Sequence, residues 1–511
     1  MTPTTIDPLG DVRPGRRPSW WLGEALAADP GVPVAPLAGE TTADVVVVGG
    51  GYTGLWTAFF LTELDPAARV VLLEQGICGG GPSGRNGGFV TAWWDELPAL
   101  VADFGTERGL ARARAMAGAV DDVGAWCETH GVDAWYRKAG YLVASAAPAQ
   151  DGAFAETLET CARLGAGEEY VALSPSEVQA RCASPILRAG VFLRSGATVQ
   201  PALLARGLRR VLIERGVVIH EGTRVVEIDG RREGLGWPLG TASSSSRGGS
   251  SRGASSPGGP VTVRTDAGGV PGEVRAEALV LGLNAWAAAW PWAEGRLLTW
   301  SSYIVLTEPI PDRLAELGWT GGEGLCDARF TLHYLRTTRD GRIALGGGGG
   351  RAGWAGRIGP AFTADTGSAR RAAAGLRAMF PSLADVRIED AWGGPIDICD
   401  DHRPFFGTLP GGRIHLGHGY SGNGVAPAHL GGRILAALAL ERANDPVLDQ
   451  PIVGRRPRRF PPEPIRSIGA RVVREAIVRR EAAEAAGRSA HPLHRGITRL
   501  PRRFGYHLGP E

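Results

Sequence analysis

The run ADVVVVGGGYTGLWTAFFLTEL (Ala43–Leu64) constrains the fold more than any other part of the chain. Four valines precede a glycine turn and an apolar helix face follows it, which is typical of a buried strand that leads into a helix. Gly49, Gly51 and Gly54 match the pattern G-x-G-x-x-G, which is weak by itself in a chain with 76 glycines but has the right context here. The segment predicts the start of a doubly wound, Rossmann-like domain that binds a dinucleotide.

Each glycine of this pattern has its own steric role. Gly49 permits the tight turn, Gly51 lets the backbone approach a pyrophosphate at the helix N-terminus, and Gly54 allows close helix–strand packing. The next apolar run, VVLLE, ends in Glu74, which lies 25 residues after Gly49. A carboxylate at that strand end can accept hydrogen bonds from the ribose hydroxyls of an adenosine. These residues predict a dinucleotide but leave NAD and FAD open.

A second glycine-rich run, GGGPSGRNGGFV (Gly79–Val90), follows directly and has Arg85 as its only charge. A nicotinamide dehydrogenase has no need for such a loop after the acidic strand. A flavin cofactor buried lengthwise does need one, because its pyrophosphate and ring must pass beside the backbone. The loop therefore favours FAD, with Arg85 and Asn86 contacting the pyrophosphate or the ring edge.

Composition excludes several other classes of protein. The formal net charge is +2, and the six cysteines are scattered without a C-x-x-C pair, so no nucleic-acid partner, zinc site or disulfide framework is expected. The uncharged run between Asp44 and Glu63 is long enough for a membrane span, but its glycines favour a strand, turn and helix. We expect a soluble, cytoplasmic protein with no metal site, no stable membrane contact and an oligomeric state that the sequence leaves open.

Several motifs, taken in their order along the chain, resemble the D-amino-acid-oxidase-like superfamily of FAD-dependent oxidoreductases, which includes sarcosine and glycine oxidases. Within this superfamily, the chain is most similar to the gamma-glutamylputrescine-oxidase-like branch. The resemblance covers roughly residues 18–442. Besides the two glycine-rich runs, the motifs that carry it are PSWWL (Pro18–Leu22), VQPALLARGLRR (Val199–Arg210), GLNAW (Gly282–Trp286), TRDGRIALGG (Thr338–Gly347), WGGPIDICDDHRPFFG (Trp392–Gly407) and GHGYSGNGVAPAHLGGRILA (Gly417–Ala436).

The resemblance implies an α/β FAD-binding domain and a second, α+β substrate domain built on an antiparallel sheet. The FAD-binding domain would comprise 41–100, 197–288 and 397–442, with a flexible Ser/Gly-rich insertion, 240–260, at the tip of a β-hairpin. The substrate domain would comprise 101–196 and 289–396. Residues 1–40 would form an arm on the surface, and 443–511 an Arg/Pro-rich extension with one amphipathic helix.

The resemblance also implies a set of cofactor contacts. Five parts of the protein would contact FAD: the ADP-binding portion, the loop toward the ring, the adenine contact, a strand end and the turn facing the flavin pyrimidine. The residues concerned are Gly49, Gly51, Tyr52, Thr53, Gly54, Glu74, Gln75, Ser83, Gly84, Arg85, Asn86, Gly87, Gly88, Val225, Asn284, Gly422, Asn423, Gly424 and Val425. We expect non-covalent FAD, because no histidine lies between Tyr52 and His130 and Cys399 falls several residues after the family's cysteine.

The implied reaction is oxidation of a carbon–nitrogen bond in a small amine or amino acid. A hydride passes to flavin N5, the imine is hydrolysed, and O2, a quinone or another electron carrier reoxidises the flavin. Substrate-facing candidates are Tyr334 and Arg336, which would share one face of a strand with His333 on the other, and Trp392 and His418. Lys138, the chain's single lysine, lies in no segment that matches the family's oxygen-activating lysine.

Two other classes of function stay open at this point. One is an NAD(P)-linked or RNA-modifying enzyme on a similar nucleotide-binding fold. The other is a flavin-binding protein without catalysis that acts through its arginine-rich C-terminal tail. The helical spacing in 461–488 favours a helix docked on the protein itself, with a partner helix or a membrane-surface helix as alternatives.

Overall fold

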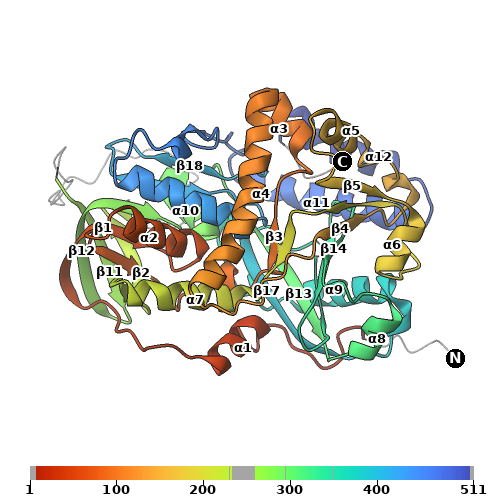
Figure 1. Cartoon of the computed structure of the whole chain (residues 1–511), viewed down its shortest axis with the longest axis horizontal. Coiled ribbons are helices and arrows are strands. Elements are labelled where there is room, and N and C mark those ends of the chain that lie inside the picture. The colour runs from red at the N-terminus through yellow and green to blue at the C-terminus, as the bar shows by residue number, and fades with distance from the viewer. Residues whose placement is uncertain (1–6, 230, 233–258, 294, 348, 507–511) are drawn as a thin grey trace.

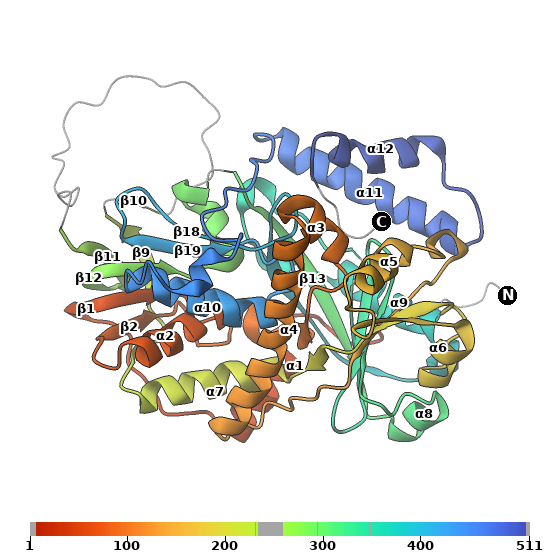
Figure 2. The same cartoon turned by 45° about the horizontal axis from the view of Figure 1, so that its top comes forward.

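Two β-sheets lie side by side along the long axis of the molecule and organise the chain (Figures 1 and 2). The computed structural model describes residues 7–229, 231–232, 259–293, 295–347 and 349–506. No helix in these ranges is long and apolar enough to cross a membrane.

The first sheet is built around the four-valine strand. Its parallel core has the order β8 (Val218–His220), β2 (Val70–Leu73), β1 (Gly39–Val48), β12 (Val270–Leu281) and β19 (Ile414–His418). Antiparallel strands extend it on the β12 side: β11 (Val261–Ala267), β9 (Arg224–Ile228), β10 (Arg231–Arg232), and β18 (Phe405–Thr408) beside β19. The predicted doubly wound, Rossmann-like sheet is confirmed.

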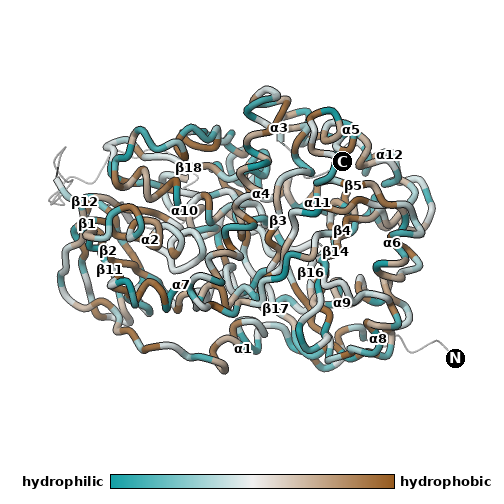
Figure 3. The backbone as a smooth tube through the Cα atoms, viewed as in Figure 1, coloured by the Kyte–Doolittle hydropathy of each residue, from teal (hydrophilic) through white to brown (hydrophobic). Residues whose placement is uncertain are grey.

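Alternate residues of β1 pack on opposite faces of this sheet, as the pleat requires. Val45 and Val47 lie in an apolar cluster with residues of three helices, α2 (Tyr52–Leu64), α7 (Pro201–Glu214) and α10 (Val425–Ala439). Val46 and Val48 lie in a second cluster with residues of β9, β11 and β12. Burial on both faces explains the continuous apolar run in the sequence. Figure 3 shows how hydrophobic and hydrophilic residues alternate along the surrounding helices.

The second sheet is antiparallel apart from one parallel pair, β14 with β4. Its order is β17 (Ile388–Ile398), β13 (Leu298–Thr307), β16 (Ile343–Gly347), β15 (His333–Thr337), β14 (Gly324–Asp327), β4 (Tyr141–Ala144), β6 (Gly190–Leu193) and β5 (Tyr170–Leu173). The helices that accompany it are α5 (Ala155–Arg163), α6 (Pro175–Arg181), α8 (Pro311–Glu316) and α9 (Thr366–Met379). The predicted second, antiparallel-sheet unit is confirmed.

Two short strands and two helices join the sheets. β3 (Phe89–Thr91) pairs with β7 (Gly196–Thr198). α3 (Leu97–Phe104) leads into the long helix α4 (Thr106–Thr129), which runs past α2 and α10 (Figure 1). The predicted boundary at residue 101 assigned α4 to the substrate domain, yet its apolar stripe shares the cluster of α2 and α10. Periodicity revealed that stripe without indicating which partner it meets.

The N-terminal segment, which was predicted to be an arm on the surface, is partly buried and anchored by hydrogen bonds. α1 (Trp20–Ala28) buries Trp20, Trp21 and Leu22. The hydroxyl of Ser19 donates to the carbonyl of Gly84 at 2.6 Å, and the Gln200 amide donates to the carbonyl of Trp21 at 2.8 Å. The prediction for 1–40 was wrong in this part, because two adjacent tryptophans bury too much apolar area to remain on a surface.

The C-terminal extension contains two helices rather than the predicted one. α11 (Ile465–Ala485) and α12 (Pro492–Arg503) lie beside each other (Figures 1 and 2). α12 escaped prediction because Pro492 and Pro501 lie within the short segment. Of the predicted insertion 240–260, residues 240–258 lie outside the described residues. The strands on either side, β10 and β11, both pair with β9, so they do not form a hairpin with each other.

Candidate active site

A cavity of about 1490 Å³ lies where the two sheets meet. Its walls come from the C-terminal ends of β1, β2 and β12, from β13, β14, β15 and β17, and from α10, α11 and α12. Pockets for one small ligand usually measure about 300–1,000 Å³. The cavity therefore has room for a dinucleotide and a second, smaller molecule.

The turn between β1 and α2 forms one end of the cavity. Gly49, Gly51, Tyr52 and Thr53 line it. Gly49 has φ +109°, and a Cβ there would lie 2.5 Å from the carbonyl oxygen of Gly282. Gly54 is not in the wall, and a Cβ on it would overlap the carbonyl oxygen of Gly49. The turn thus presents the helix N-terminus to the cavity, where backbone N–H groups favour an anion.

Glu74 lines the cavity beside this turn, as does its neighbour Gln75. Its carboxylate accepts hydrogen bonds from the backbone N–H groups of Gly50 and Gly76, each at 2.8 Å. Burial raises its pKa. A carboxylate can accept about four hydrogen bonds, so lone pairs remain for a sugar hydroxyl. Val225, predicted to contact adenine, lines the same region.

Arg85 brings a positive charge into the cavity wall. Its Nε donates to the carbonyl of Gly80 at 2.8 Å and its Nη1 to that of Gly393 at 3.4 Å. Burial lowers the pKa of this guanidinium. None of the ion pairs found among the described residues involves Arg85, so its charge is available to an anionic ligand.

Asn86 shapes the glycine loop from within. Its amide nitrogen donates to the carbonyls of Pro82 (3.1 Å) and Ser83 (3.0 Å), and its amide oxygen accepts from the N–H of Gly88 at 2.7 Å. The loop is also tied to the first turn, because the Tyr52 N–H donates to the hydroxyl of Ser83 at 2.8 Å. Ser83, Arg85, Asn86 and Gly87 line the cavity, whereas Gly84 and Gly88 lie behind the wall.

The N-terminus of α10 faces the cavity across from this loop. Gly422, Asn423, Gly424 and Val425 all line it. The N-cap residue, Gly424, provides no side-chain hydrogen bond to the first turn. The N–H groups of that first turn can therefore donate hydrogen bonds to a negatively charged group of a ligand.

Asp397 holds this turn in place, although no role was predicted for it within the motif Trp392–Gly407. One carboxylate oxygen accepts from the Asn284 amide at 3.1 Å, and the other accepts from the Gly419 N–H at 2.6 Å. Burial raises the pKa of Asp397 to about 7. Asn284 lines the cavity with φ 47°. Asp397 thus connects the end of β12 with the turn before α10.

Among the predicted substrate-facing residues, Tyr334 lies in the cavity wall. Its hydroxyl is 2.9 Å from the hydroxyl of Ser302, and burial raises its pKa to about 12. Tyr334 and Arg336 share one face of β15, as predicted, because both approach the glycine loop. His333 lies on the other face, where its Nδ1 is 2.8 Å from Asp327.

The other three candidates do not reach the cavity, so the predicted contact with substrate is corrected for each. The buried guanidinium of Arg336 donates to the carbonyls of Val199 and Thr337 and lies over the Trp21 ring, and burial lowers its pKa to about 9. The Trp392 indole N–H donates to the carbonyl of Arg85 at 2.8 Å. These two side chains support the glycine loop from behind.

His418 is also buried behind the wall. Its ring nitrogens have no hydrogen-bond partner among the described residues, and burial lowers its pKa to about 3. It sits near Phe405, with the two ring centroids 6.2 Å apart. His418 is therefore a neutral side chain in the apolar layer beneath the turn. Tyr420, two residues later, does line the cavity, and its hydroxyl accepts from Thr53 at 2.9 Å.

Sequence reasoning missed most of the opposite wall. Phe89, Tyr141 and Tyr334 form a row of aromatic rings, with centroid distances of 5.5 Å from Phe89 to Tyr141 and 5.7 Å from Phe89 to Tyr334. Asp95, which follows the Trp93-Trp94 pair, is open to the cavity. These residues come from strands and turns far apart in sequence, so no local motif could have joined them.

The C-terminal extension also contributes to the wall, mainly through Arg466, Arg474 and Ile477 of α11. Arg474 holds the helix in place by donating to the carbonyls of Gly349 and Gly350, each at 2.7 Å. The extension is therefore docked on the protein's own body, as the helical spacing favoured.

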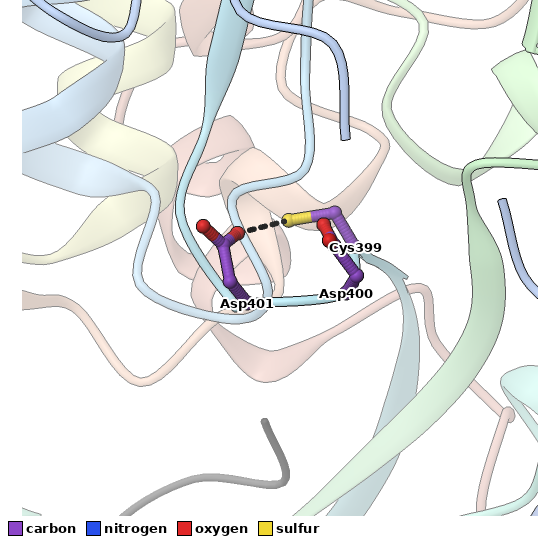
Figure 4. A group of neighbouring side chains, drawn as sticks. All are labelled: Cys399, Asp400 and Asp401. Atoms are coloured by element: carbon purple, nitrogen blue, oxygen red, sulfur yellow. Dashed lines mark hydrogen bonds between the residues drawn. The ribbon is translucent and has the colours of Figure 1, made fainter. Parts of the chain in front are cut away.

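Cys399, Asp400 and Asp401 gather three possible metal ligands at the end of β17 (Figure 4). Both carboxylates already meet Arg455, at 3.5 Å for Asp400 and 2.6 Å for Asp401. The Cys399 thiol donates to the carbonyl of Arg403 at 3.1 Å, and burial raises its pKa. The positive charge of Arg455 therefore offsets part of the negative charge of the two carboxylates. Cys399 touches the cavity, so the non-covalent attachment predicted from alignment stays a prediction.

Lys138 lies away from the cavity. It pairs with Asp121 at 2.5 Å, and both side chains are largely exposed. Since the chain has no other lysine, no lysine ammonium is available in the cavity wall.

Comparison with known proteins agrees with this geometry. The family model described as FAD dependent oxidoreductase matches residues 44–438. A probable oxidoreductase, OrdL, from Rhizobium meliloti is 26% identical over 434 residues, covering 83% of this chain and 89% of its own. The gamma-glutamylputrescine oxidoreductase of Escherichia coli is 27% identical over 421 residues, covering 81% and 87%.

Solved structures share the fold. The glycine oxidase of Geobacillus kaustophilus has a TM-score of 0.60 and 18% identity, covering 81% of this chain and 99% of its own. The L-proline dehydrogenase of P. horikoshii has a TM-score of 0.59 and 19% identity, covering 81% and 97%.

The residues in the cavity fit FAD. The turn before α2 offers N–H groups, Glu74 offers a carboxylate beside them, and Arg85 offers a cation in the glycine loop. The capless N-terminus of α10 adds donors on the far side. Together they would hold an adenosine, a pyrophosphate and an electron-rich ring in one continuous volume.

Proposed function

Because the chain belongs to the FAD-dependent oxidoreductase family, we propose that it oxidises a carbon–nitrogen bond of an amine or amino acid. FAD supplies the acceptor for a hydride, so that the amine becomes an imine, which water hydrolyses to a carbonyl compound and a smaller amine. The observation that carries the proposal is the continuity of the cavity, whose nucleotide-binding turn and α10 N-terminus share one space with the Tyr334 wall.

The residues near the proposed reaction centre position the substrate rather than remove a proton from it. Tyr334 keeps its proton at neutral pH, because its pKa is raised to about 12, and it exchanges a hydrogen bond with Ser302. Hydride loss requires the amine nitrogen to be neutral, with its lone pair free. The hydroxyl pair can hold such a nitrogen without protonating it.

The N-terminus of α10 has a second role in the proposal. When the cofactor gains electrons, negative charge accumulates on the pyrimidine side of its ring. N–H groups from Gly424 and Val425 would stabilise that charge. Asp397 keeps the preceding turn in register through Asn284 and Gly419.

The known activities named for two similar proteins support the choice of substrate class. One acts on gamma-glutamylputrescine and one solved structure is a glycine oxidase. In this chain the electron acceptor is either O2 or an electron carrier. A cytoplasmic location stays a prediction from the scattered cysteines, all six of which are buried and unpaired.

The test is anaerobic mixing of the FAD-loaded protein with alkylamines, diamines, N-methyl amino acids and D- and L-amino acids. We expect one class to bleach the flavin absorbance, and admission of air would then separate an oxidase from a dehydrogenase. Amides of the same carbon skeletons are the control, because their nitrogen lone pairs are delocalised. A flavin that no amine or amino acid reduces would refute the proposal.

A further inference from the structure

The carboxylate of Asp95 is a feature of the cavity that oxidation of a simple amine does not require. Asp95 lies between β3 and α3, and its exposed side chain lines the cavity. Across the described ranges, no arginine, lysine or histidine forms an ion pair with it. Neighbouring Glu96 also lines the cavity and adds negative charge. A carboxylate that has no cation of the protein beside it can accept a charge-assisted hydrogen bond from an ammonium group in the ligand space.

An aromatic track connects Asp95 with the glycine loop. At one end, a Cβ on Gly87 would lie 2.9 Å from the Tyr334 ring, so Tyr334 touches the loop. Phe89 follows Tyr334, and Tyr141 follows Phe89. At the other end, Asp95 is near enough to Tyr141 to raise the pKa of its phenol. Aromatic faces accept both methylene chains and cations.

The two ends of this track carry opposite charges. Arg85 lies in the glycine loop without an acidic partner among the described ion pairs, whereas Asp95 lies at the far end. The arginine disfavours a cation near the loop and the aspartate favours one at its own end. An amine that loses a hydride must be neutral at its reacting nitrogen, and a carboxylate beside that nitrogen would keep it protonated. Asp95 therefore suits a nitrogen that does not react.

We propose that Asp95 is a specificity-determining residue, which binds a second ammonium group of the substrate several carbons away from the nitrogen that reacts. The reacting nitrogen would lie near Gly87 and Tyr334, and the chain between the two nitrogens would follow Phe89 and Tyr141. This inference rests on the proposed function, because it assumes that amine oxidation takes place at the glycine-loop end.

The test compares unbranched diaminoalkanes of three to eight carbons with monoalkylamines of equal length. Each is added to the FAD-loaded full-length protein, and kcat/KM is measured with the electron acceptor that the anaerobic mixing test identifies. For the wild type we expect a diamine of one length to exceed its monoamine by about ten- to a hundredfold, as a hydrogen bond to a charged group implies.

Asp95→Asn keeps the shape and removes the charge, so it should reduce this diamine-to-monoamine ratio by the same factor. Asp95→Glu keeps the charge and should retain most of the ratio. The matched control is Glu159→Gln, which removes an exposed carboxylate of the neighbouring helix α5 that does not line the cavity. FAD content and melting temperature show whether each variant is folded.

The outcomes separate the two proposals. A wild type that oxidises diamines and monoamines equally well, or an Asp95→Asn variant that keeps the diamine preference with full FAD content, would overturn the role of Asp95 and leave amine oxidation intact. A flavin that no amine reduces would overturn both.

Discussion

The wall on the nucleotide side of the cavity consists largely of backbone, whereas the wall opposite consists of side chains. Gly49, Gly51 and the turn before Val425 present N–H groups or allow close approach. The opposite wall presents the rings of Phe89 and Tyr141 and the carboxylate of Asp95. Binding to a backbone wall depends on steric fit at single residue positions. A side-chain wall depends on charge and shape, which can change with the substrate while the fold persists.

The largest expected effect comes from adding one methyl group directly behind the backbone wall. Gly54→Ala places its Cβ against the carbonyl of Gly49, and neither atom can move without shifting β1 or α2. We expect FAD affinity to fall more than about a hundredfold and the free energy of unfolding to fall by about 1–3 kcal/mol. Flavin absorbance per protein and thermal melting measure both quantities.

Gly118→Ala is the matched control, since Gly118 also lies within a helix but has open space around its Cβ position. It should leave FAD binding unchanged. Normal FAD content in Gly54→Ala would contradict the steric constraint that we infer for the turn between β1 and α2.

A smaller but still large effect is expected at Arg85, which carries a positive charge on the nucleotide side of the cavity. Arg85→Ala removes the cation facing the ligand space, and we expect FAD to bind about ten- to a hundredfold more weakly, as a hydrogen bond to a charged group implies. Equilibrium dialysis of FAD measures the change. Arg69→Ala, which removes an exposed partner of Asp44, should have no effect. Unchanged FAD affinity in Arg85→Ala would contradict the placement of the pyrophosphate or ring beside the loop.

The side-chain wall should respond to pH. Desolvation by the surrounding protein, together with the negative charge of Glu96, raises the pKa of Asp95 to about 7, so its carboxylate is mostly ionised above that pH and mostly protonated below it. The ratio of kcat/KM for a diamine over its monoamine should therefore fall as the pH drops below about 7, by up to tenfold per unit. The titratable groups around Asp95 are Glu96, Tyr141, Tyr170, Cys161 and Cys326.

Protonation of the reacting nitrogen lowers kcat/KM for the diamine and the monoamine alike, so this effect cancels in the ratio. In Asp95→Asn the ratio should be independent of pH between 6 and 8. A ratio that changes with pH equally in both proteins would assign the titration to another group.

The smallest expected effect concerns a residue behind the wall. Trp392→Phe removes the hydrogen bond from the indole to the carbonyl of Arg85 and part of a fully buried ring. We expect FAD affinity to be lowered severalfold at most, and the free energy of unfolding to fall by about 1–3 kcal/mol. Trp354→Phe, at a position that is 44% exposed, is the control. A loss of activity with normal FAD binding would instead indicate that Trp392 contacts the substrate.

The difference between the walls also explains what the sequence could predict. Gly49, Gly51 and Glu74 lie within one short stretch of sequence, so the strand, turn, helix and acidic residue could be identified locally. Arg336 was placed on the correct face of its strand, but its long side chain turns to the carbonyl of Val199, which lies in a distant segment. Nothing near Asp95 or Asp397 in the sequence indicates its role, because only the assembled sheets bring Asp95 to the cavity and Asp397 to Asn284.

The most direct measurement is an anaerobic crystal structure with FAD and a diaminoalkane bound. The account predicts adenosine beside Glu74, the flavin ring between Gly87 and the N-terminus of α10, and one ammonium group within hydrogen-bonding distance of Asp95. A flavin bound outside this cavity, or a diamine with both nitrogens remote from Asp95, would contradict it.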